Sequence, residues 1–220
     1  MPNVFVRSRS ALAAVAVSVA MAAPAFAQAK PAPATPQAAL DALEAAIAAG
    51  DAKATMALLT ADGQKRLAKE AITGSLAMLA LADPNDPNPM GPKPAPAELA
   101  NQKKAYAEAK TTITAALKPS GLDAAIGKPL MPAMEAVDAK IATVDAVTVV
   151  PALWDAVMKA GPSLGMKQKQ PIMKIGPFTA LKVDGDHATV KSGPRTMKID
   201  KVGGKWLIDA PLPELKEPAQ

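Results

Sequence analysis

The stretch that decides the fold is Lys174–Asp209, which reads KIGPFTALKVDGDHATVKSGPRTMKIDKVGGKWLID. Its apolar and polar residues alternate, and the alternation is broken three times by residues that favour tight turns. The segments between the breaks predict strands over 174–183 and 187–191, around Met197 and Ile199, and over 205–209. Four strands joined by short turns predict an antiparallel meander.

The alternation indicates that one face of this sheet is buried. Ala188 and Val190 fall on one face, whereas His187, Thr189 and Lys191 fall on the other. In the last strand, Trp206 and Ile208 likewise fall on one face. We therefore expect one face of the meander to pack against the rest of the protein and the other to face water.

The residues ahead of the meander predict helices. Thr35 is expected to cap a first helix that begins at Pro36 and stops at Gly50, and Asp51 is expected to cap a second. Helices gathered ahead of an antiparallel sheet make the α+β class, with the helices packed on the sheet. Further helices are expected, from the spacing of apolar residues, over 64–82, 97–117, 131–146 and 151–161.

The domain boundaries follow from composition. Residues 83–96 hold six prolines in 14 residues and predict a long surface loop. Residues 36–210, with this loop inside them, are long enough for one α+β domain. An extended tail is expected over 211–220.

Residues 1–27 have the pattern of a cleavable signal peptide. A positive start at Arg7 is followed by the apolar run 11–23, which is too short to span a membrane, and by the small-x-small pattern of Ala25-Phe26-Ala27. Residues 28–35 then predict a disordered Pro/Ala linker. We expect the mature protein in the periplasm or outside a bacterial cell, with no transmembrane segment after cleavage. The chain has no cysteine, so no disulfide contributes to its stability.

Three short motifs carry a resemblance to a known family. They are Gly50-Asp51 at the joint of the first two helices, Asp184-Gly185-Asp186-x-Ala188-x-Val190, and Val202-Gly203-Gly204-Lys205-Trp206-x-Ile208-Asp209. With these motifs the chain resembles exported bacterial NTF2-like (cystatin-like) domains, many of which have no known activity. The resemblance implies a curved sheet that wraps over the helices as a cone. Residues 84–165 are longer and more helical than a minimal domain needs, which leaves open whether they fill the pocket of the cone.

Charge is distributed unevenly along the chain. Residues 161–205 hold nine basic and three acidic residues, whereas residues 28–160 are close to neutral. A basic, exposed sheet face is expected to attract anionic envelope material such as lipid head groups or acidic glycans, and the alternative is a solvated face without a partner. Aromatic residues are too scarce for a single-stranded nucleic-acid platform, so no nucleic acid is expected as a partner. The candidate binding residues are Lys191, Arg195, Lys198, Lys201 and Lys205.

Few residues are available for chemistry. His187 is the only histidine, and with Asp184 or Asp186 it is a candidate acid–base group; the alternative is an ordinary surface position. The segment 161–165 matches G-x-S-x-G, but no predicted strand precedes Ser163, so the match indicates a helix-ending turn. With one histidine and no cysteine, neither a metal site nor a cofactor is expected.

These observations leave three functional hypotheses. The first is a non-catalytic periplasmic binding or interaction module, with an unknown small ligand or an envelope protein as its partner. The second is an envelope-associated protein that uses its basic sheet face to bind anionic lipids or glycans. The third is a small hydrolase or isomerase that uses His187 with Asp184 or Asp186. A buried histidine in a cavity would favour the third hypothesis, whereas an exposed one would leave the first two.

Overall fold

The computed structural model describes residues 33–85, 96–164 and 177–209. Residues 32–220 group into one compact unit. The predicted segments that lie wholly or mostly outside the described residues are the signal peptide 1–27, the linker 28–35, the loop 83–96 and the tail 211–220.

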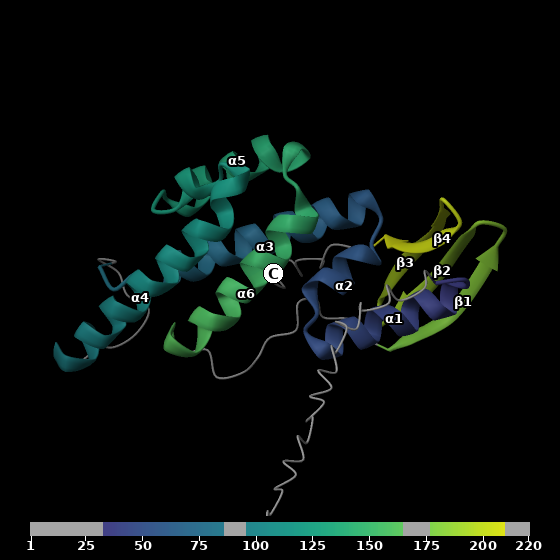
Figure 1. Cartoon of the computed structure of the whole chain (residues 1–220), viewed down its shortest axis with the longest axis horizontal. Helices are drawn as coiled ribbons and strands as arrows, with labels where there is room; N and C mark the ends of the chain where they lie inside the picture. The colour runs from purple at the N-terminus through teal and green to yellow at the C-terminus, as the bar shows by residue number, and fades with distance from the viewer. Residues whose placement is uncertain (1–32, 86–95, 165–176, 210–220) are drawn as a thin grey trace, which may run out of the picture. The chain divides into compact units, whose positions relative to one another are not determined.

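Within the described residues, all helices precede four strands (Figure 1). The predicted α+β class, with a C-terminal four-stranded antiparallel meander, is confirmed. The helices are α1 (Pro36–Ala49), α2 (Ala52–Ala57), α3 (Ala61–Leu81), α4 (Pro96–Leu117), α5 (Leu130–Lys140) and α6 (Ala146–Ala160). Short 3-10 helices are η1 (Lys118–Ser120), η2 (Asp123–Ala125), η3 (Ile141–Thr143) and η4 (Gly161–Leu164). The strands are β1 (Phe178–Asp184), β2 (His187–Ser192), β3 (Arg195–Val202) and β4 (Lys205–Asp209).

The residues expected to bound the first two helices do so. The Thr35 hydroxyl accepts a hydrogen bond from the Ala38 N–H at the start of α1, and the Asp51 carboxylate accepts one from the Ala54 N–H at the start of α2. Gly50 ends α1 with a left-handed φ of 67°, a conformation that suits glycine because it has no Cβ.

The predicted start of α6 is wrong by five residues. The sequence predicts a helix from Pro151, but α6 begins at Ala146, with Pro151 inside it. Asp145 caps the helix, since its carboxylate accepts hydrogen bonds from the N–H and the hydroxyl of Thr148. Val150 in the early part of α6 is fully buried, and this burial offsets the hydrogen bond that the proline ring cannot make.

The predicted helix over 131–146 is too long at its C-terminal end. Helix α5 stops at Lys140, and η3 and an extended Val144 separate it from α6. Ile141, Thr143 and Val144 are β-branched, which lowers helix propensity. The Lys140 ammonium donates a hydrogen bond of 2.8 Å to the Gly121 carbonyl, and this contact holds the end of α5 against the chain that follows α4.

The strands pair in chain order, β1-β2-β3-β4, and each pair is antiparallel. Helix α1 contacts β1 and β4, and Figure 1 shows it lying beside the strands. The predicted alternation is confirmed, because the inner face of β2, β3 and β4 is buried. Its buried side chains are Ala188, Val190, Met197, Ile199, Trp206 and Ile208.

Residues 58–60, which precede α3, form backbone hydrogen bonds with the outer edge of β4. The Ile208 N–H donates to the Leu58 carbonyl at 2.9 Å, and the Thr60 N–H donates to the Ile208 carbonyl at 3.0 Å. A covered edge leaves no free backbone groups for pairing with another chain. The open strand edge of the described sheet is therefore that of β1.

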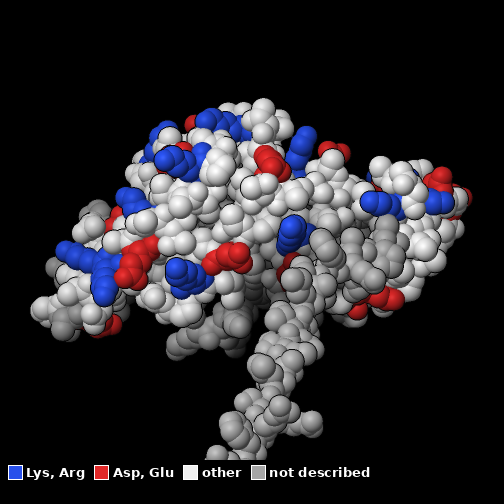
Figure 2. All heavy atoms as spheres, in the orientation of Figure 1, with Lys and Arg blue, Asp and Glu red and all other residues white. Residues whose placement is uncertain are grey.

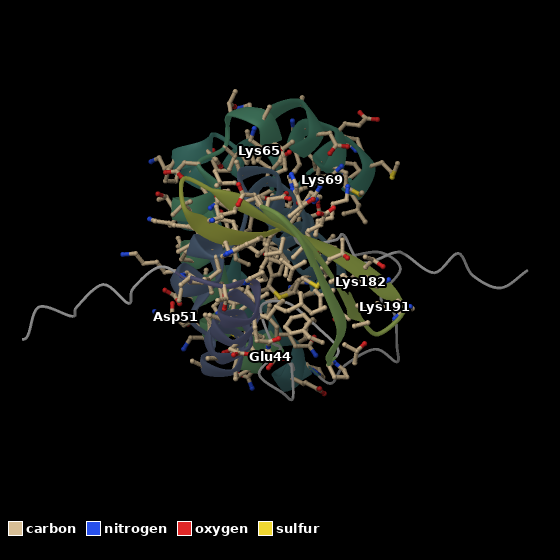
Figure 3. The ribbon with its side chains drawn as sticks, turned by 90° about the vertical axis from the view of Figure 1, so that its right-hand side faces the viewer. Glu44, Asp51, Lys65, Lys69, Lys182 and Lys191 are labelled. Carbon is tan, nitrogen blue, oxygen red and sulfur yellow. The ribbon has the colours of Figure 1, made fainter. Side chains whose placement is uncertain are left out.

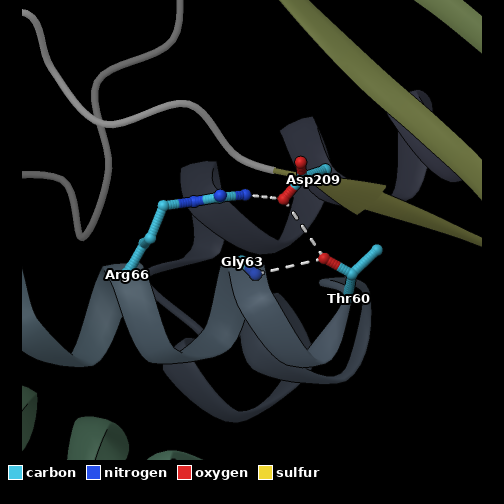
Figure 4. A network of polar contacts seen from close by, with 4 residues as sticks. All are labelled: Thr60, Gly63, Arg66 and Asp209. Carbon is cyan, nitrogen blue, oxygen red and sulfur yellow. Dashed lines mark hydrogen bonds and ion pairs between the residues drawn. The ribbon is translucent and has the colours of Figure 1, made fainter. Parts of the chain in front are cut away.

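A polar joint fixes the end of β4 to the start of α3 (Figure 4). Asp209 forms an ion pair with Arg66 and accepts a hydrogen bond of 3.3 Å from the Thr60 hydroxyl. The Thr60 oxygen in turn accepts the Gly63 N–H at 3.1 Å as the cap of α3. This cap explains why α3 begins at Ala61, three residues before its predicted start.

Helices α3 and α6 form the centre of the helical part. Helix α6 contacts α2, α3 and α4, and α3 also contacts α5. Ile72, Ile113 and Leu153 are each fully or almost fully buried among these helices. No helix in the described ranges has the length and apolar character required to cross a membrane.

Candidate functional site

The outer face of the sheet carries lysine and threonine side chains in alternation. Residues of β1, β2 and β3 that lie directly opposite one another form two neighbouring rows across the sheet. Every side chain in these two rows is exposed. Neighbouring strands lie about 4.8 Å apart, so lysines on β1 and β3 are attached about 10 Å apart. We name these six residues the lysine–threonine face: Lys182, Thr189 and Lys198 in one row, and Thr179, Lys191 and Thr196 in the next.

A β-bulge in β1 builds part of this face. Thr179 pairs with Lys191 and Lys182 pairs with Thr189, so three steps along β1 match two along β2. Ala180 lies in the bulge with a φ of 54°, which is uncommon for a residue other than glycine. Without the extra residue, Thr179 and Lys182 would point to opposite faces. The bulge therefore brings Thr179 onto the face opposite Lys191. Lys182 is placed there by the regular pairing that starts at the β1–β2 turn, and the sequence-based prediction missed this lysine.

Three acidic residues, Asp184, Asp200 and Asp209, lie on the outer side of the sheet, and the last two have close partners. Asp200 lies 2.8 Å from the His187 imidazole, and Asp209 forms the ion pair with Arg66. Among the described residues, none of the three lysines of the lysine–threonine face forms an ion pair. The six residues of the face thus include three lysines and no acidic residue, and Asp184 is the exposed carboxylate beyond the Lys182 row.

Glu44 of α1 and Asp51, the cap of α2, do not lie at this face (Figure 3). Figure 3 shows Lys182 and Lys191 on neighbouring strands, while Glu44 and Asp51 lie on the side of α1 and α2. Over the helices seen in Figure 2, basic and acidic side chains are interspersed. Mixed charges largely cancel at a distance, whereas unpaired charges of one sign add.

The five predicted binding residues divide between the two faces of the sheet. Lys191 and Lys198 belong to the lysine–threonine face, and Lys205 lies on the same outer side at the β3–β4 turn. Arg195 and Lys201 instead share the alternation of the buried inner face. Arg195 and Lys201 therefore do not share the face of the other three candidates, because successive side chains point to opposite faces of a strand.

Arg195 and Lys201 interact with other residues of the protein. Lys201 forms an ion pair of 3.3 Å with Asp186, and its ammonium lies 5.9 Å from the centre of the Trp206 ring. Arg195 lies close enough to Glu70 to act on its carboxyl: partial burial raises the pKa of Glu70, and the Arg195 charge opposes this effect. Both basic residues thus interact within the protein.

His187 is exposed, with 78% of its side chain accessible, and its partner differs from the predicted one. Nδ1 lies 2.8 Å from Asp200, whereas Asp184 and Asp186 act on it only through their charges. The hydrogen bond to Asp200 is the largest cause that raises the pKa of His187 above its usual 6.5. An exposed histidine leaves the two non-catalytic hypotheses.

Two concave sites lie elsewhere among the described residues. A groove of about 290 Å³ between α3 and α6 is lined by Glu70, Gly74 and Trp154 among others. A larger pocket of about 580 Å³ lies between α3, α4 and residues 125–133. None of the predicted site residues lines either of them.

The described residues give little support to a metal site or to a catalytic serine. They contain no group of three or more His, Cys, Asp or Glu side chains placed to hold a metal ion. Ser163 lies in η4, directly after α6, where a nucleophile elbow would need a preceding strand.

Comparison of the chain with protein-family models, with curated proteins and with solved structures finds no match. Its function is therefore inferred from its own residues.

Proposed function

We propose that the protein is a non-catalytic binding module of the bacterial periplasm or cell surface, and that it binds acidic polysaccharide through the lysine–threonine face. One observation carries this proposal: three unpaired, exposed lysines alternate with three threonines on one side of three neighbouring strands. The exposed position of His187 gives no support to a catalytic function.

The two residue types suit the two polar groups of such a polymer. A lysine ammonium is a mobile point charge with three donors, which attracts carboxylates without fixed geometry. A threonine hydroxyl both donates and accepts hydrogen bonds, as sugar hydroxyls do. Exposed charges are screened within about 8 Å at physiological salt, so binding through this face weakens as salt is added.

A polysaccharide fits this face better than a lipid bilayer does. Stable membrane binding usually combines basic residues with apolar side chains that enter the bilayer. The lysine–threonine face holds no large apolar side chain, and the nearest exposed one on the outer side of β3 is Val202, at the far turn. Charge without an apolar anchor favours a hydrated polyanion.

We also propose that the protein is exported and that its domain is related to NTF2-like domains. The pattern of residues 1–27 supports export. The helix pair joined at Gly50-Asp51 and the C-terminal meander support the relationship.

The test compares two triple variants that change the net charge equally. Lys182→Glu/Lys191→Glu/Lys198→Glu reverses the face, and Lys103→Glu/Lys104→Glu/Lys118→Glu reverses three exposed lysines of α4 and η1. Binding to polygalacturonate is measured by calorimetry at low and physiological salt, with dextran as the uncharged polymer.

We expect the face variant to weaken binding at least tenfold, or about 1.4 kcal/mol, and the α4 variant to stay within twofold of the unmodified protein. Equal losses in both variants would mean that only net charge matters and would contradict the proposal. Binding to phosphatidylglycerol vesicles without binding to polygalacturonate would favour a lipid surface instead.

A further inference from the structure

The larger pocket has the form of a small-molecule site. Its volume of about 580 Å³ falls in the usual range of about 300–1,000 Å³ for ligand pockets. No strand contributes to it, so it is separate from the lysine–threonine face. Its apolar wall includes Leu76, Leu79, Ala125, Ile126 and Ala133.

Two opposite charges line this pocket without a charged partner. Asp83 Oδ1 accepts hydrogen bonds from the backbone N–H of Asn85 at 2.9 Å and from its amide at 3.2 Å, and Oδ2 accepts the Tyr106 hydroxyl at 3.4 Å. These donors are neutral, and no cation of the described chain pairs with Asp83. Lys128 likewise meets no carboxylate there.

The entrance and one side of the pocket are also defined. Leu130 lines the pocket and is 40% exposed, so an apolar side chain lies at its mouth. The Lys110 ammonium lies 5.9 Å from the centre of the Tyr106 ring, and a Cβ added at Gly127 would come within 3.9 Å of it. Lys110 thus lies near both Tyr106 and Gly127, two residues that line the pocket.

We propose that this pocket binds a small zwitterion with an apolar body, namely an apolar amino acid or a short apolar peptide. The ligand ammonium meets Asp83, its carboxylate meets Lys128, and its side chains cover the apolar wall. A simple carboxylate would leave Asp83 without a cation and place two anions in one pocket. A simple amine would leave the exposed Lys128 with water as its partner. A ligand that carries both charges satisfies both residues.

The ligand chemistry is tested with three probes on the purified chain. Leu-Leu carries both charges, N-acetyl-Leu-Leu lacks the ammonium, and Leu-Leu-amide lacks the carboxylate. Calorimetry is expected to show Leu-Leu binding at least tenfold more tightly than either blocked form. Equal binding of all three, or no binding of Leu-Leu at millimolar concentration, would overturn the proposal.

Two substitutions test which pocket residue binds which charged group of the ligand. In Lys128→Met, Leu-Leu should bind no better than Leu-Leu-amide, and in Asp83→Asn no better than N-acetyl-Leu-Leu. Asparagine keeps an acceptor oxygen for Asn85, and circular dichroism verifies the fold of each variant. If either variant kept the full preference for Leu-Leu, the assignment of that residue would be wrong.

A second pair of variants tests the apolar mouth. Leu130→Gln is expected to weaken Leu-Leu binding severalfold, whereas Met131→Gln changes an equally apolar, 67% exposed neighbour that does not line the pocket and should have no effect. Equal effects of the two changes would contradict a ligand at this mouth. The face variant Lys182→Glu/Lys191→Glu/Lys198→Glu should bind Leu-Leu normally, which separates this inference from the proposed polysaccharide function.

Discussion

At the scale of single residues, Ala180 bears the clearest strain of the described chain. It is the one non-glycine residue there with a positive φ, 54°, and such a conformation costs about 1–3 kcal/mol. The position is maintained because Thr179 and Lys182 on either side both pair with β2. The strain is thus tied to the arrangement that brings Thr179 opposite Lys191 on the lysine–threonine face.

We predict that Ala180→Gly raises the free energy of unfolding by about 0.5–1 kcal/mol, because glycine adopts positive φ without a Cβ clash. Ala180→Val should lower it, since a β-branched side chain tolerates this conformation worst. Urea unfolding measures both changes. A less stable glycine variant would show that the bulge is not strained at this position.

His187 gives a prediction for pH. Since its folded-state pKa is raised, its pair with Asp200 stabilises the protein fully below about pH 6.5 and less as the pH rises through the folded-state value. His187 is the only histidine, so its proton NMR titration is unambiguous. We expect a pKa above 6.5 that falls in Asp200→Asn but stays raised in Asp184→Asn. A larger effect of Asp184→Asn would restore the partner predicted from the sequence.

The pKa of the Tyr106 hydroxyl tests its contact with Asp83 in the same way. Burial raises the pKa of the Tyr106 hydroxyl above 10, and the charge and hydrogen bond of Asp83 raise it further. Since Tyr106 is the only tyrosine, its ultraviolet absorbance can be titrated directly. Asp83→Asn should lower this pKa, while Asp123→Asn, which changes a carboxylate outside the pocket, should leave it unchanged. An unchanged value in Asp83→Asn would contradict the contact.

The partner of His187 shows what sequence reasoning can find at this scale. Asp184 and Asp186 are its neighbours along the chain, and they were therefore predicted as partners. The β2–β3 turn is formed by Gly193 and Pro194, and a two-residue turn sets His187 opposite Asp200. Counting back from that turn would have found the partner. The bulge at Ala180 could not have been found this way, because no residue there marks it.

At the scale of elements, turns and caps were predictable and the interior of α6 was not. Gly185, Gly193 and the Gly203-Gly204 pair all adopt positive φ, which is why glycine there marks the turns so clearly. Pro151 suggested a helix start because proline favours the first turn. The burial of Val150 overrides that preference, and burial of a particular side chain is not visible in the sequence.

The joint between β4 and α3 gives the prediction at this scale. Thr60→Ala removes the cap of α3 and the hydrogen bond to Asp209, and should lower the free energy of unfolding by about 1–2 kcal/mol. Thr111→Ala is the control, because its hydroxyl bonds only to the Ala107 carbonyl within α4. Thermal or urea unfolding measures both. Equal changes in the two variants would mean that the joint contributes no special stability.

At the scale of the whole molecule, the fold class and the buried inner face of the sheet follow from the sequence, whereas the concave sites do not. The larger pocket joins Leu79, Tyr106 and Leu130, which lie on three different helices, and only their packing brings them together. The composition of the core is a further property of the whole molecule. About a third of the buried apolar residues are alanine, which limits how closely large side chains can fill the space between helices.

The distribution of charge also changes from sequence to structure. The basic segment 161–205 is continuous along the chain, but alternation along the strands places Arg195 and Lys201 on the other face from Lys191 and Lys198. The register set by the β1–β2 turn places Lys182 opposite Thr189 on the outer face. The proposed binding surface is therefore defined by strand register, not by the density of lysine along the chain.

The most direct test of this account compares two single charge reversals in polygalacturonate binding. Lys182→Glu changes a lysine that only the strand register places on the face, and Lys201→Glu changes one of the same basic segment that the structure places elsewhere. We predict that Lys182→Glu weakens binding at least about threefold at low salt and that Lys201→Glu, with its fold verified by circular dichroism, does not. Equal weakening by both, or a larger effect at Lys201, would contradict the lysine–threonine face as the binding surface.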